Sequence, residues 1–333
     1  MGNKVLESTK VLVDNPSFVK INDFKLEEMA NHFANQKWSL PSYESPVYPG
    51  CVGDDLVDFF ILINTINFAF KDFETKKKYG TEFDGQYYRG AMGMFASLKK
   101  SFDEGLPLFD GAYLSDMPRD DLKKVFTGNI PIPMFEERLD ILRQVGSTLH
   151  ELYDDSFHNI LDASNNRLFD DGNGFIERLI GDFPSFDDSV NYDGQIIRFD
   201  KRAQLVSAML YGRFKKYNME LFEDIDELNV MADYILPQTL RDMGILEYES
   251  SLAERIDREE IILASSLEEM ELRASTIHVA HRMIEQVNYR MPDDKKINVI
   301  HMDNALWSFF RSGKAEELGL KKTPHHLTPT IYY

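Results

Sequence analysis

The stretch PMFEERLDILRQVGSTLHELY, residues 133–153, decides the class of fold, because its apolar residues recur at helical spacing. The positions that share one face at intervals of three or four residues are Leu139, Leu142, Val145 and Leu149. Polar residues fall between them, as in a helix that buries one face and exposes the other. We therefore expect an amphipathic helix over this stretch.

The same periodicity recurs along much of the chain. The other stretches that we predict to be helices are residues 22–36, 90–105, 201–217 and 267–291. Strand signals are sparse: Asp84-Gly85 between short aromatic flanks predicts a β-hairpin, and residues 192–199 are a second, weaker candidate. The polar, glycine-rich stretch 165–175 predicts a surface loop. The predicted fold is mainly α, with one or two small β-hairpins.

The length and composition indicate a globular chain. With 333 residues, of which 43% are hydrophobic, the chain can bury a large core, as one domain over residues 1–333 or as two packed helical subdomains. The net charge of -19 disfavours binding to a nucleic acid backbone, where affinity comes from Lys and Arg. It still allows a small anion held by a few local cations.

Neither a membrane nor a secretory route is indicated by the sequence. The longest apolar run, residues 56–70, is too short and too polar to span a bilayer, and the first ten residues hold no apolar signal segment. Cys51 is the only cysteine, which excludes a disulfide framework and a cysteine-based zinc site. We expect a cytoplasmic protein that does not bind membranes.

Lys201 and Arg202 form a basic pair at the expected start of the helix over residues 201–217. A cation is unfavourable there, because the N-terminus of a helix carries partial positive charge. An anion next to Lys201 would relieve this, and free helix N–H groups suit a phosphate. Spacing alone favours a simpler interpretation, a solvated basic pair on the surface.

Asp233 is the single carboxylate within the apolar stretch VMADYILPQTL, residues 230–240. Pro237 disfavours helical backbone at the residue before it. We therefore expect the helix that carries Val230 and Met231 to end near Asp233, and a new helix to begin at Asp233 or close to Pro237. A carboxylate at such a junction accepts backbone N–H bonds and stays ionised. Spacing favours a helix cap, and a catalytic carboxylate is compatible with it.

Further polar residues stand in apolar surroundings. They are Asn67, Glu271, Arg273 and Asp303. Buried polar groups with hydrogen-bond partners are the commoner explanation for each. The sequence contains no HExxH, CxxC, GxGxxG or P-loop pattern, and the pair His325-His326 is a poor metal site. We expect neither a metal nor a cofactor.

Nine segments, in the same order along nearly the whole chain, resemble the queuosine salvage family. They are VLESTK…VLVDNPSFVKIN, INFAF, YYRGAMGMFASLKKSFDEGLPL, MFEERLDILRQVG, FPSFDD…YDGQ, KRAQLV, DIDELNVMADYILPQTLRDMGIL, EMELRASTIHVA and PHHLTPTIYY. Members of this family are queuosine 5'-phosphate N-glycosidases that release the base queuine. The resemblance implies a mostly α, metal-free fold similar to helix-hairpin-helix DNA glycosylases.

The resemblance also implies roles for individual residues. Lys201 and Asp233 match the family motifs KRAQ and ADY.VPQ, so we expect them to be catalytic. The predicted substrate-binding residues are Asn67, Phe68, Phe186, Arg202, Tyr234, Gln238 and Asp303. Their polar groups suit the edge of a 7-deazaguanine base, and their aromatic rings suit its flat face. The implied substrate is queuosine 5'-monophosphate.

Two positions depart from the family pattern, and two alternative functions stay open. Lys71 stands where Trp is usual, which affects one wall of the pocket, and Asp187 stands where Arg is usual, which removes a cation. One alternative is a glycosidase that acts on a base in DNA or RNA, which the charge disfavours. The other is a non-catalytic helical interaction protein, which predicts that Lys201 and Asp233 lie far apart.

Overall fold

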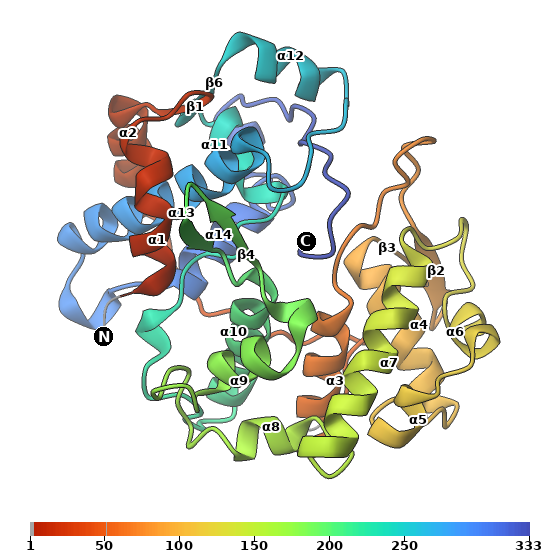
Figure 1. Cartoon of the computed structure of the whole chain (residues 1–333). Coiled ribbons are helices and arrows are strands. Elements are labelled where there is room, and N and C mark those ends of the chain that lie inside the picture. The colour runs from red at the N-terminus through yellow and green to blue at the C-terminus, as the bar shows by residue number, and fades with distance from the viewer. Residues whose placement is uncertain (1–2, 51) are drawn as a thin grey trace. The chain divides into compact units, whose positions relative to one another are not determined.

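The computed structural model describes residues 3–50 and 52–333, so Cys51 lies outside the described residues (Figure 1). The chain divides into two compact units, each built from separate segments. The first unit comprises Met1–Pro41, Asp188–Gln204 and Asp226–Pro329. The second comprises Ser42–Asp187, Leu205–Ile225 and Thr330–Tyr333.

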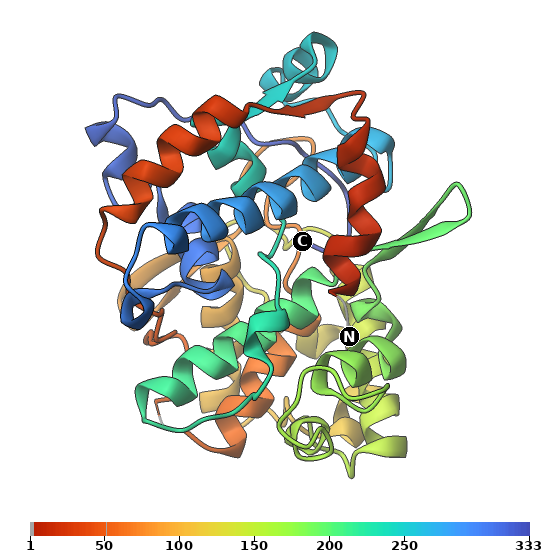
Figure 2. The ribbon, with the colours of Figure 1, turned by 90° about the vertical axis from the view of Figure 1, so that its left-hand side faces the viewer.

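The long helix α13 (Leu267–Tyr289) is the centre of the first unit. It packs against α1 (Lys4–Asp14), α2 (Asp23–Ala34), α11 (Ile235–Asp242) and α14 (Val299–Ser308). Figure 2 shows α13 running beside α1 and α2. Thirteen of its residues are buried, including polar ones, which is typical of a helix enclosed on several sides.

Two small antiparallel sheets and four short helices complete the first unit. The sheets are β1 (Val19–Ile21) with β6 (Leu246–Tyr248), and β4 (Ser189–Tyr192) with β5 (Gln195–Arg198). The helices are η2 (Ile225–Glu227), α12 (Ser250–Asp257), η3 (Asp293–Lys295) and α15 (Lys314–Glu317). The β4–β5 hairpin lies beside α1, as Figure 2 shows.

The second unit is built on helices and one hairpin. Its elements are α3 (Asp54–Thr65), β2 (Gly80–Phe83), β3 (Gln86–Arg89), α4 (Ala91–Asp103), α5 (Gly111–Ser115), α6 (Arg119–Val125), α7 (Phe135–Leu152), α8 (His158–Asp162), α9 (Phe175–Asp182) and η1 (Pro184–Phe186). Helix α7 packs closely on α5, and Gly146 makes this possible: a Cβ there would lie 2.3 Å from the backbone nitrogen of Ser115.

The mainly α prediction is confirmed. All five predicted stretches are helical, as α7, α2, α4, α13 and α10 (Lys201–Lys216), the last running from the first unit into the second. Both predicted hairpins form, as β2–β3 and β4–β5, and residues 165–174 are a loop. The β1–β6 pair was not predicted, because three-residue strands carry too little periodicity. The likeness to helix-hairpin-helix glycosylases stays a prediction.

The predicted helix through Val230 and Met231 is wrong. Residues 228–232 are irregular between η2 and α11. Side chains satisfy the backbone of this segment in place of a helix: Gln204 binds the N–H of Asn229 at 2.6 Å, and Asp303 binds that of Met231 at 2.8 Å. These long-range partners do not appear in local sequence spacing.

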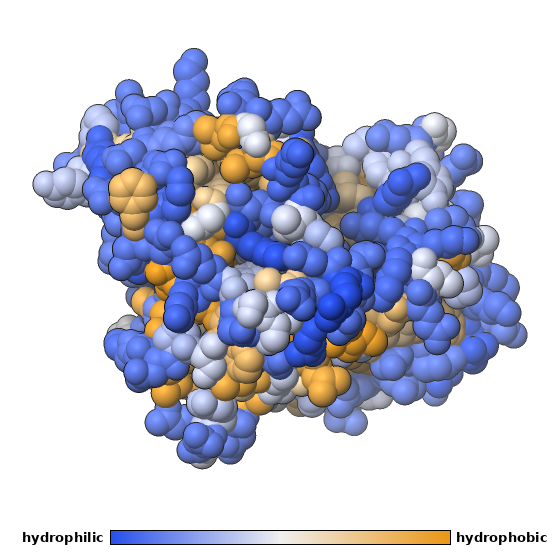
Figure 3. All heavy atoms as spheres, turned by 90° about the horizontal axis from the view of Figure 1, so that it is seen from above, coloured by the Kyte–Doolittle hydropathy of each residue, from blue (hydrophilic) through white to orange (hydrophobic). Residues whose placement is uncertain are grey.

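The molecular surface in Figure 3 is mostly hydrophilic. On the face shown in Figure 3, hydrophilic residues cover most of the area, and apolar residues form smaller patches. Within residues 3–50 and 52–333, no helix is both long and apolar enough to cross a bilayer.

Candidate active site

Asp233 lies in the first unit, two residues before the first residue of α11, Ile235. Its Oδ1 accepts hydrogen bonds from the backbone nitrogens of Ile235 at 2.6 Å and Leu236 at 3.3 Å. Removal from water raises the pKa of this partly buried carboxyl, while the charge of Lys201 and the two N–H bonds oppose the rise. Asp233 therefore caps the first two N–H groups of α11 from the position before the N-cap residue Tyr234, and it is held rigidly next to a cation.

Lys201 is the first residue of α10, and its side chain is only 5% exposed. Burial lowers the pKa of its ammonium, and Asp233 is the largest opposing influence. The ammonium makes no hydrogen bond or ion pair with the described residues. A buried cation next to a carboxylate, with its own donors uncommitted, is suited to hold a polar ligand.

Asp303 is a second carboxyl close to Asp233 and Lys201. It projects from α14, and its Oδ1 accepts the N–H of Met231 at 2.8 Å. Burial raises the pKa of Asp303 to about 7; the charge of Asp233 adds to the rise, and Lys201 opposes it. The two carboxyls therefore differ in environment, an arrangement that separates a proton-holding group from an ionised one.

A buried ion pair positions the backbone around these groups. Arg273 of α13 donates to both carboxylate oxygens of Asp188, at 2.9 and 2.5 Å. The Nε of Arg273 donates to the carbonyl of Ala232 at 3.0 Å, and Asp188 also accepts the backbone N–H of Lys201 at 3.2 Å. One ion pair thus connects the start of α10 to the residue before Asp233.

Two further predicted residues, Tyr234 and Gln238, contact the C-terminal segment of the first unit. The ring of Tyr234 lies against that of His325, with centroids 4.4 Å apart. Gln238 is buried, and its amide nitrogen donates to the carbonyl of Thr323. Part of what sequence reasoning assigned to base binding therefore serves to hold this segment.

The remaining predicted residues of the first unit and those of the second are all buried. Arg202 is 1% exposed, and its charge lowers the pKa of Lys201. In the second unit, Asn67 donates to Asn64 at 3.1 Å, and the ring of Phe68 lies 4.3 Å from the guanidinium carbon of Arg138.

Arg138 organises the segment that carries Asn67 and Phe68. Its guanidinium, which is fully buried, donates to the carbonyls of Ile66, Phe68 and Ala69, and to that of Pro133. The backbone N–H of Ala69 donates in turn to the carbonyl oxygen of the last residue, Tyr333, at 3.2 Å. Tyr333 is buried, so the aromatic C-terminal residue packs against the protein.

Phe186 occupies the short helix η1 of the second unit. It is 1% exposed and meets the ring of Phe183 edge-on, with centroids 6.5 Å apart. The next residue, Asp187, is one of the two departures from the family pattern. The substrate-binding roles of Asn67, Phe68 and Phe186 stay predictions.

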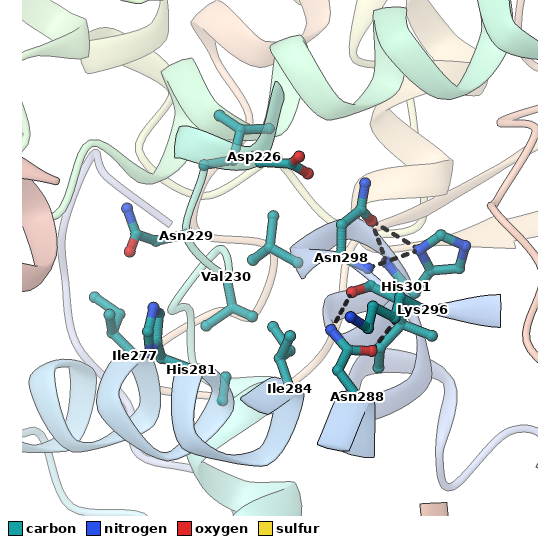
Figure 4. Close-up of a pocket in the computed structure, with 14 residues that line it drawn as sticks. Asp226, Asn229, Val230, Ile277, His281, Ile284, Asn288, Lys296, Asn298 and His301 are labelled. Atoms are coloured by element: carbon teal, nitrogen blue, oxygen red, sulfur yellow. Dashed lines mark hydrogen bonds between the residues drawn. The ribbon is translucent and has the colours of Figure 1, made fainter. Parts of the chain in front are cut away.

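A cavity of about 440 Å³ lies in the first unit, but no predicted site residue lines it (Figure 4). Apolar side chains such as Val230, Ile277 and Ile284 form much of its wall. Its amide side chains are bonded within the protein: Asn288 to the backbone of Ile297, and Asn298 to His301. We assign no ligand to this cavity.

Sequence reasoning missed Asp188 and underrated Arg273. Arg273 was noticed as a polar residue in an apolar stretch, but its partner is 85 positions away along the chain. No local spacing indicates that pairing. In the described part of the chain, no cluster of three or more His, Cys, Asp and Glu side chains could hold a metal ion.

A matching family model and three similar proteins all point to one family. The family model described as "Queuosine salvage protein" matches residues 48–333. A protein of Sphaerobacter thermophilus named "Queuosine 5'-phosphate N-glycosylase/hydrolase" is 31% identical over 99% of this chain and 97% of its own length. Proteins with the same name from Mus musculus and Schizosaccharomyces pombe are 26% and 27% identical; the alignments cover 98% and 94% of this chain and 95% and 93% of theirs.

Proposed function

Because the chain belongs to the queuosine salvage protein family, we propose that it hydrolyses the N-glycosidic bond of queuosine 5'-monophosphate. The products are the base queuine and ribose 5-phosphate, and the base becomes available for insertion into tRNA. The printed names of the relatives support an enzyme with a small nucleotide substrate. The cytoplasmic location and the absence of membrane binding remain expectations from the sequence.

One observation carries the assignment to this chain: Lys201 and Asp233 are electrostatic neighbours within one compact unit. They are separated by 32 positions in the sequence, yet each alters the pKa of the other. A non-catalytic interaction protein predicts that the two lie far apart. Their proximity, with the ammonium uncommitted, favours an enzyme.

Asp233 is the group that we assign to the reacting sugar. As the bond between C1' and N9 breaks, its electron pair goes to the base and positive charge develops on the sugar, which a fixed carboxylate stabilises. The same carboxylate orients the attacking water and accepts its proton as the new C–O bond forms. One preorganised charged group of this kind is typically worth about 10²–10³ in rate.

The other groups keep Asp233 ionised and serve the departing base. The positive charge of Lys201 opposes protonation of Asp233 and offers donors to the substrate. Asp303, whose pKa lies near neutrality, retains a proton that a carboxylate of ordinary pKa would lose. A 7-deazaguanine has carbon at position 7, so the departing base takes up a proton elsewhere, and we assign Asp303 to that polar edge.

A competing glycosidase function on DNA or RNA remains the main alternative. An enzyme that extracts a base from a nucleic acid needs basic surface for the phosphate backbone, and this chain has 37 basic against 56 acidic residues. The acidic balance suits the cationic amine arm of queuosine instead. We therefore expect intact tRNA to be a poor substrate.

Identification of the products tests the proposed function. Queuosine 5'-monophosphate is incubated with the protein, and products are separated by chromatography and identified by mass. We expect free queuine and ribose 5-phosphate in equal amounts. Queuosine and inorganic phosphate would instead reveal a phosphatase and contradict the proposal, while release of queuine from intact tRNA at a comparable rate would favour the nucleic acid alternative.

A further inference from the structure

The β4–β5 hairpin, whose sequence overlaps the family segment FPSFDD…YDGQ, has no part in the proposed function. Figure 2 shows it projecting from the first unit, and residues 193–196 at its turn are exposed. Its base is buried: Asp188 and Phe199, which flank the two strands, are each 3% exposed. The backbone N–H of Phe199 donates to the carbonyl of Asp188 at 2.9 Å and closes this end of the hairpin. The base of the hairpin is therefore built into the interior of the unit.

Arg273 of α13 is held at this base from two directions. Its guanidinium carbon lies 4.0 Å from the centroid of the Phe199 ring, and its terminal nitrogens donate to both carboxylate oxygens of Asp188. Glu269, one turn earlier on α13, adds a second carboxylate at 3.5 Å. A planar guanidinium that is fixed by a bidentate carboxylate and packed on an aromatic face has little freedom to move. We call Asp188, Phe199 and Arg273 the hairpin clamp.

Two hydrogen bonds lead from the hairpin clamp to the backbone that carries the proposed catalytic residues. Asp188 accepts the N–H of Lys201 at 3.2 Å, which fixes the first residue of α10. The Nε of Arg273 donates to the carbonyl of Ala232 at 3.0 Å, directly before Asp233. The clamp thus holds both ends of the distance that separates Lys201 from Asp233.

Lys201 and Asp233 depend on such support, because their side chains do not bind each other. The ammonium of Lys201 makes no hydrogen bond or ion pair with the described residues, so its place beside Asp233 is set by the backbone. A shift of about 1 Å in a positioned catalytic group can cost about 10² in rate. The precision of this backbone therefore matters for the chemistry.

A buried ion pair can also serve the fold alone. Two observations favour a role in the reaction for Arg273. Its remaining donor is directed at the carbonyl next to Asp233, and its charge reaches the same carboxylate: burial raises the pKa of Asp233, and Arg273 is among the groups that oppose the rise. The guanidinium therefore acts on the place of Asp233 and on its ionisation.

We propose that Arg273 is a positioning residue for the reaction, which together with Asp188 and Phe199 sets where Lys201 stands relative to Asp233. This rests on the proposed function, in which Lys201 and Asp233 act on the substrate. Arg273 acts through the carbonyl of one residue and the amide of another, and the base of the β4–β5 hairpin is the support that holds it.

Steady-state kinetics on queuosine 5'-monophosphate test the positioning role. Arg273→Lys keeps the charge but cannot bond Asp188 at two points and Ala232 together, so kcat should fall about tenfold to a hundredfold. KM should stay within about threefold of the wild type, because the lost interaction serves the reacting geometry rather than substrate binding. Wild-type kcat in the folded variant, or a change confined to KM, would overturn the proposal.

Asp188→Asn is a milder second variant, in case Arg273→Lys does not fold. Its amide oxygen can still accept one hydrogen bond, so the hairpin base keeps part of its contacts. We expect kcat to fall by a smaller factor, again with little change in KM, and thermal melts show whether the protein measured is folded. A folded Asp188→Asn with wild-type kcat would contradict the role of the clamp.

A double-mutant cycle separates positioning from general damage to the fold. In the Asp233→Asn background, the charge that Arg273 holds in place is absent. Adding Arg273→Lys there should cost less than about threefold in the single-turnover rate, because most of its effect passes through Asp233. Damage to the fold would lower the rate by the same factor in both backgrounds, and that outcome would overturn the proposal.

The matched control is Arg255 of α12, which also binds one carboxylate and one carbonyl. It donates to Glu268 at 2.6 Å and to the carbonyl of Ile261 at 3.4 Å, and neither contact involves the backbone of Lys201 or Asp233. Arg255→Lys should leave kcat within about twofold of the wild type, since a partly exposed pair contributes little. Equal losses of kcat in Arg255→Lys and Arg273→Lys would contradict a specific role of Arg273.

Amide hydrogen exchange on the full chain provides a readout that needs no turnover. In Arg273→Lys, the N–H groups of Lys201, Ile235 and Leu236 should exchange at least about tenfold faster than in the wild type, because the segments that carry them are released. In Arg255→Lys they should exchange as in the wild type. Unchanged exchange in Arg273→Lys overturns the clamp even if the wild type releases queuine. Absence of queuine release by the wild type defeats the proposed function, while the exchange rates still decide whether Arg273 holds these segments.

Discussion

Asp233 has two roles that a single carboxylate can fill together. Its Oδ1 caps α11 through Ile235 and Leu236, which fixes the direction of the carboxyl group. Its charge is retained against burial by Lys201, whose ammonium makes no hydrogen bond or ion pair with the described residues. The structural role thus supplies the rigidity that the proposed catalytic role needs.

Replacement of Asp233 by asparagine separates these roles. In Asp233→Asn the amide oxygen can still accept the N–H groups of Ile235 and Leu236, so the melting temperature should change little. The charge is lost, so kcat should fall by at least about 10². Single-turnover rates and thermal melts on one preparation measure both. A variant whose free energy of unfolding falls by about 0.5–2 kcal/mol, yet which turns over normally, would contradict the catalytic role and leave Asp233 with the capping role alone.

The pH dependence of kcat should report the cluster of Asp233, Asp303 and Lys201. As the pH falls through the raised pKa of Asp233, that carboxylate takes up a proton and the rate declines. As the pH rises through the lowered pKa of Lys201, the ammonium loses its charge and the rate declines again. We predict a bell-shaped profile whose limbs belong to the coupled cluster.

Asp303→Asn should remove the titration of Asp303 from the folded protein. With its pKa raised to about 7, Asp303 holds a proton at acid pH, whereas an asparagine amide neither gains nor loses one. Stability is the readout: Asp303 holds a proton in the folded protein that the unfolded chain releases near pH 4, so the free energy of unfolding decreases as pH rises from about 4 to about 7. The variant should flatten this decrease. A free energy of unfolding that falls with pH as steeply in the variant as in the wild type would contradict the raised pKa of Asp303.

At the scale of elements, the site depends on irregular backbone held by distant side chains. Residues 228–232 are fixed by Gln204, Asp303 and Arg273, which come from α10, α14 and α13. The second unit uses the same device, since Arg138 of α7 holds the carbonyls of residues 66, 68 and 69. In both places a buried charged or amide side chain replaces the hydrogen bonds of regular structure.

Arg138 should be among the most sensitive residues of the second unit. Arg138→Lys keeps the charge but cannot reach four carbonyls, so we expect the free energy of unfolding to fall by about 3 kcal/mol or more. Urea denaturation measures it. The control is Arg119→Lys, because Arg119 is exposed, lies over the ring of Phe135 and pairs with Glu136 at 2.5 Å on the surface, where solvent screens the contact. Equal losses in both variants would contradict the role of Arg138.

The regular elements could be predicted from the sequence, and the long-range contacts could not. Helices such as α7 and α13 follow from apolar periodicity, and the β2–β3 hairpin follows from Asp84-Gly85. The helix expected through Met231 failed because Asp303, 72 positions away, binds its N–H. Lys201 and Asp233 were candidates from their local sequence, and the family motifs assigned them catalytic roles, whereas Asp188 has no local signal.

At the scale of the whole molecule, the predicted site residues come from segments that are far apart in the sequence. Each compact unit is assembled from three separate segments, and α10 carries the chain from the first unit into the second just after Lys201 and Arg202. The predicted site residues are distributed over both units: Asp233 and Asp303 are in the first, and Asn67 is in the second. The full chain is therefore the form in which activity has to be measured.

A competition assay on the full chain tests the central claim most directly. Queuosine 5'-monophosphate and guanosine 5'-monophosphate are supplied together at equal concentration, with a chelator present because every proposed step uses side chains of this chain. We predict release of queuine and ribose 5-phosphate with negligible guanine, since a site built for the amine arm is left with an unpaired group when that arm is absent. No queuine, or guanine released at the same rate as queuine, would contradict the proposed function.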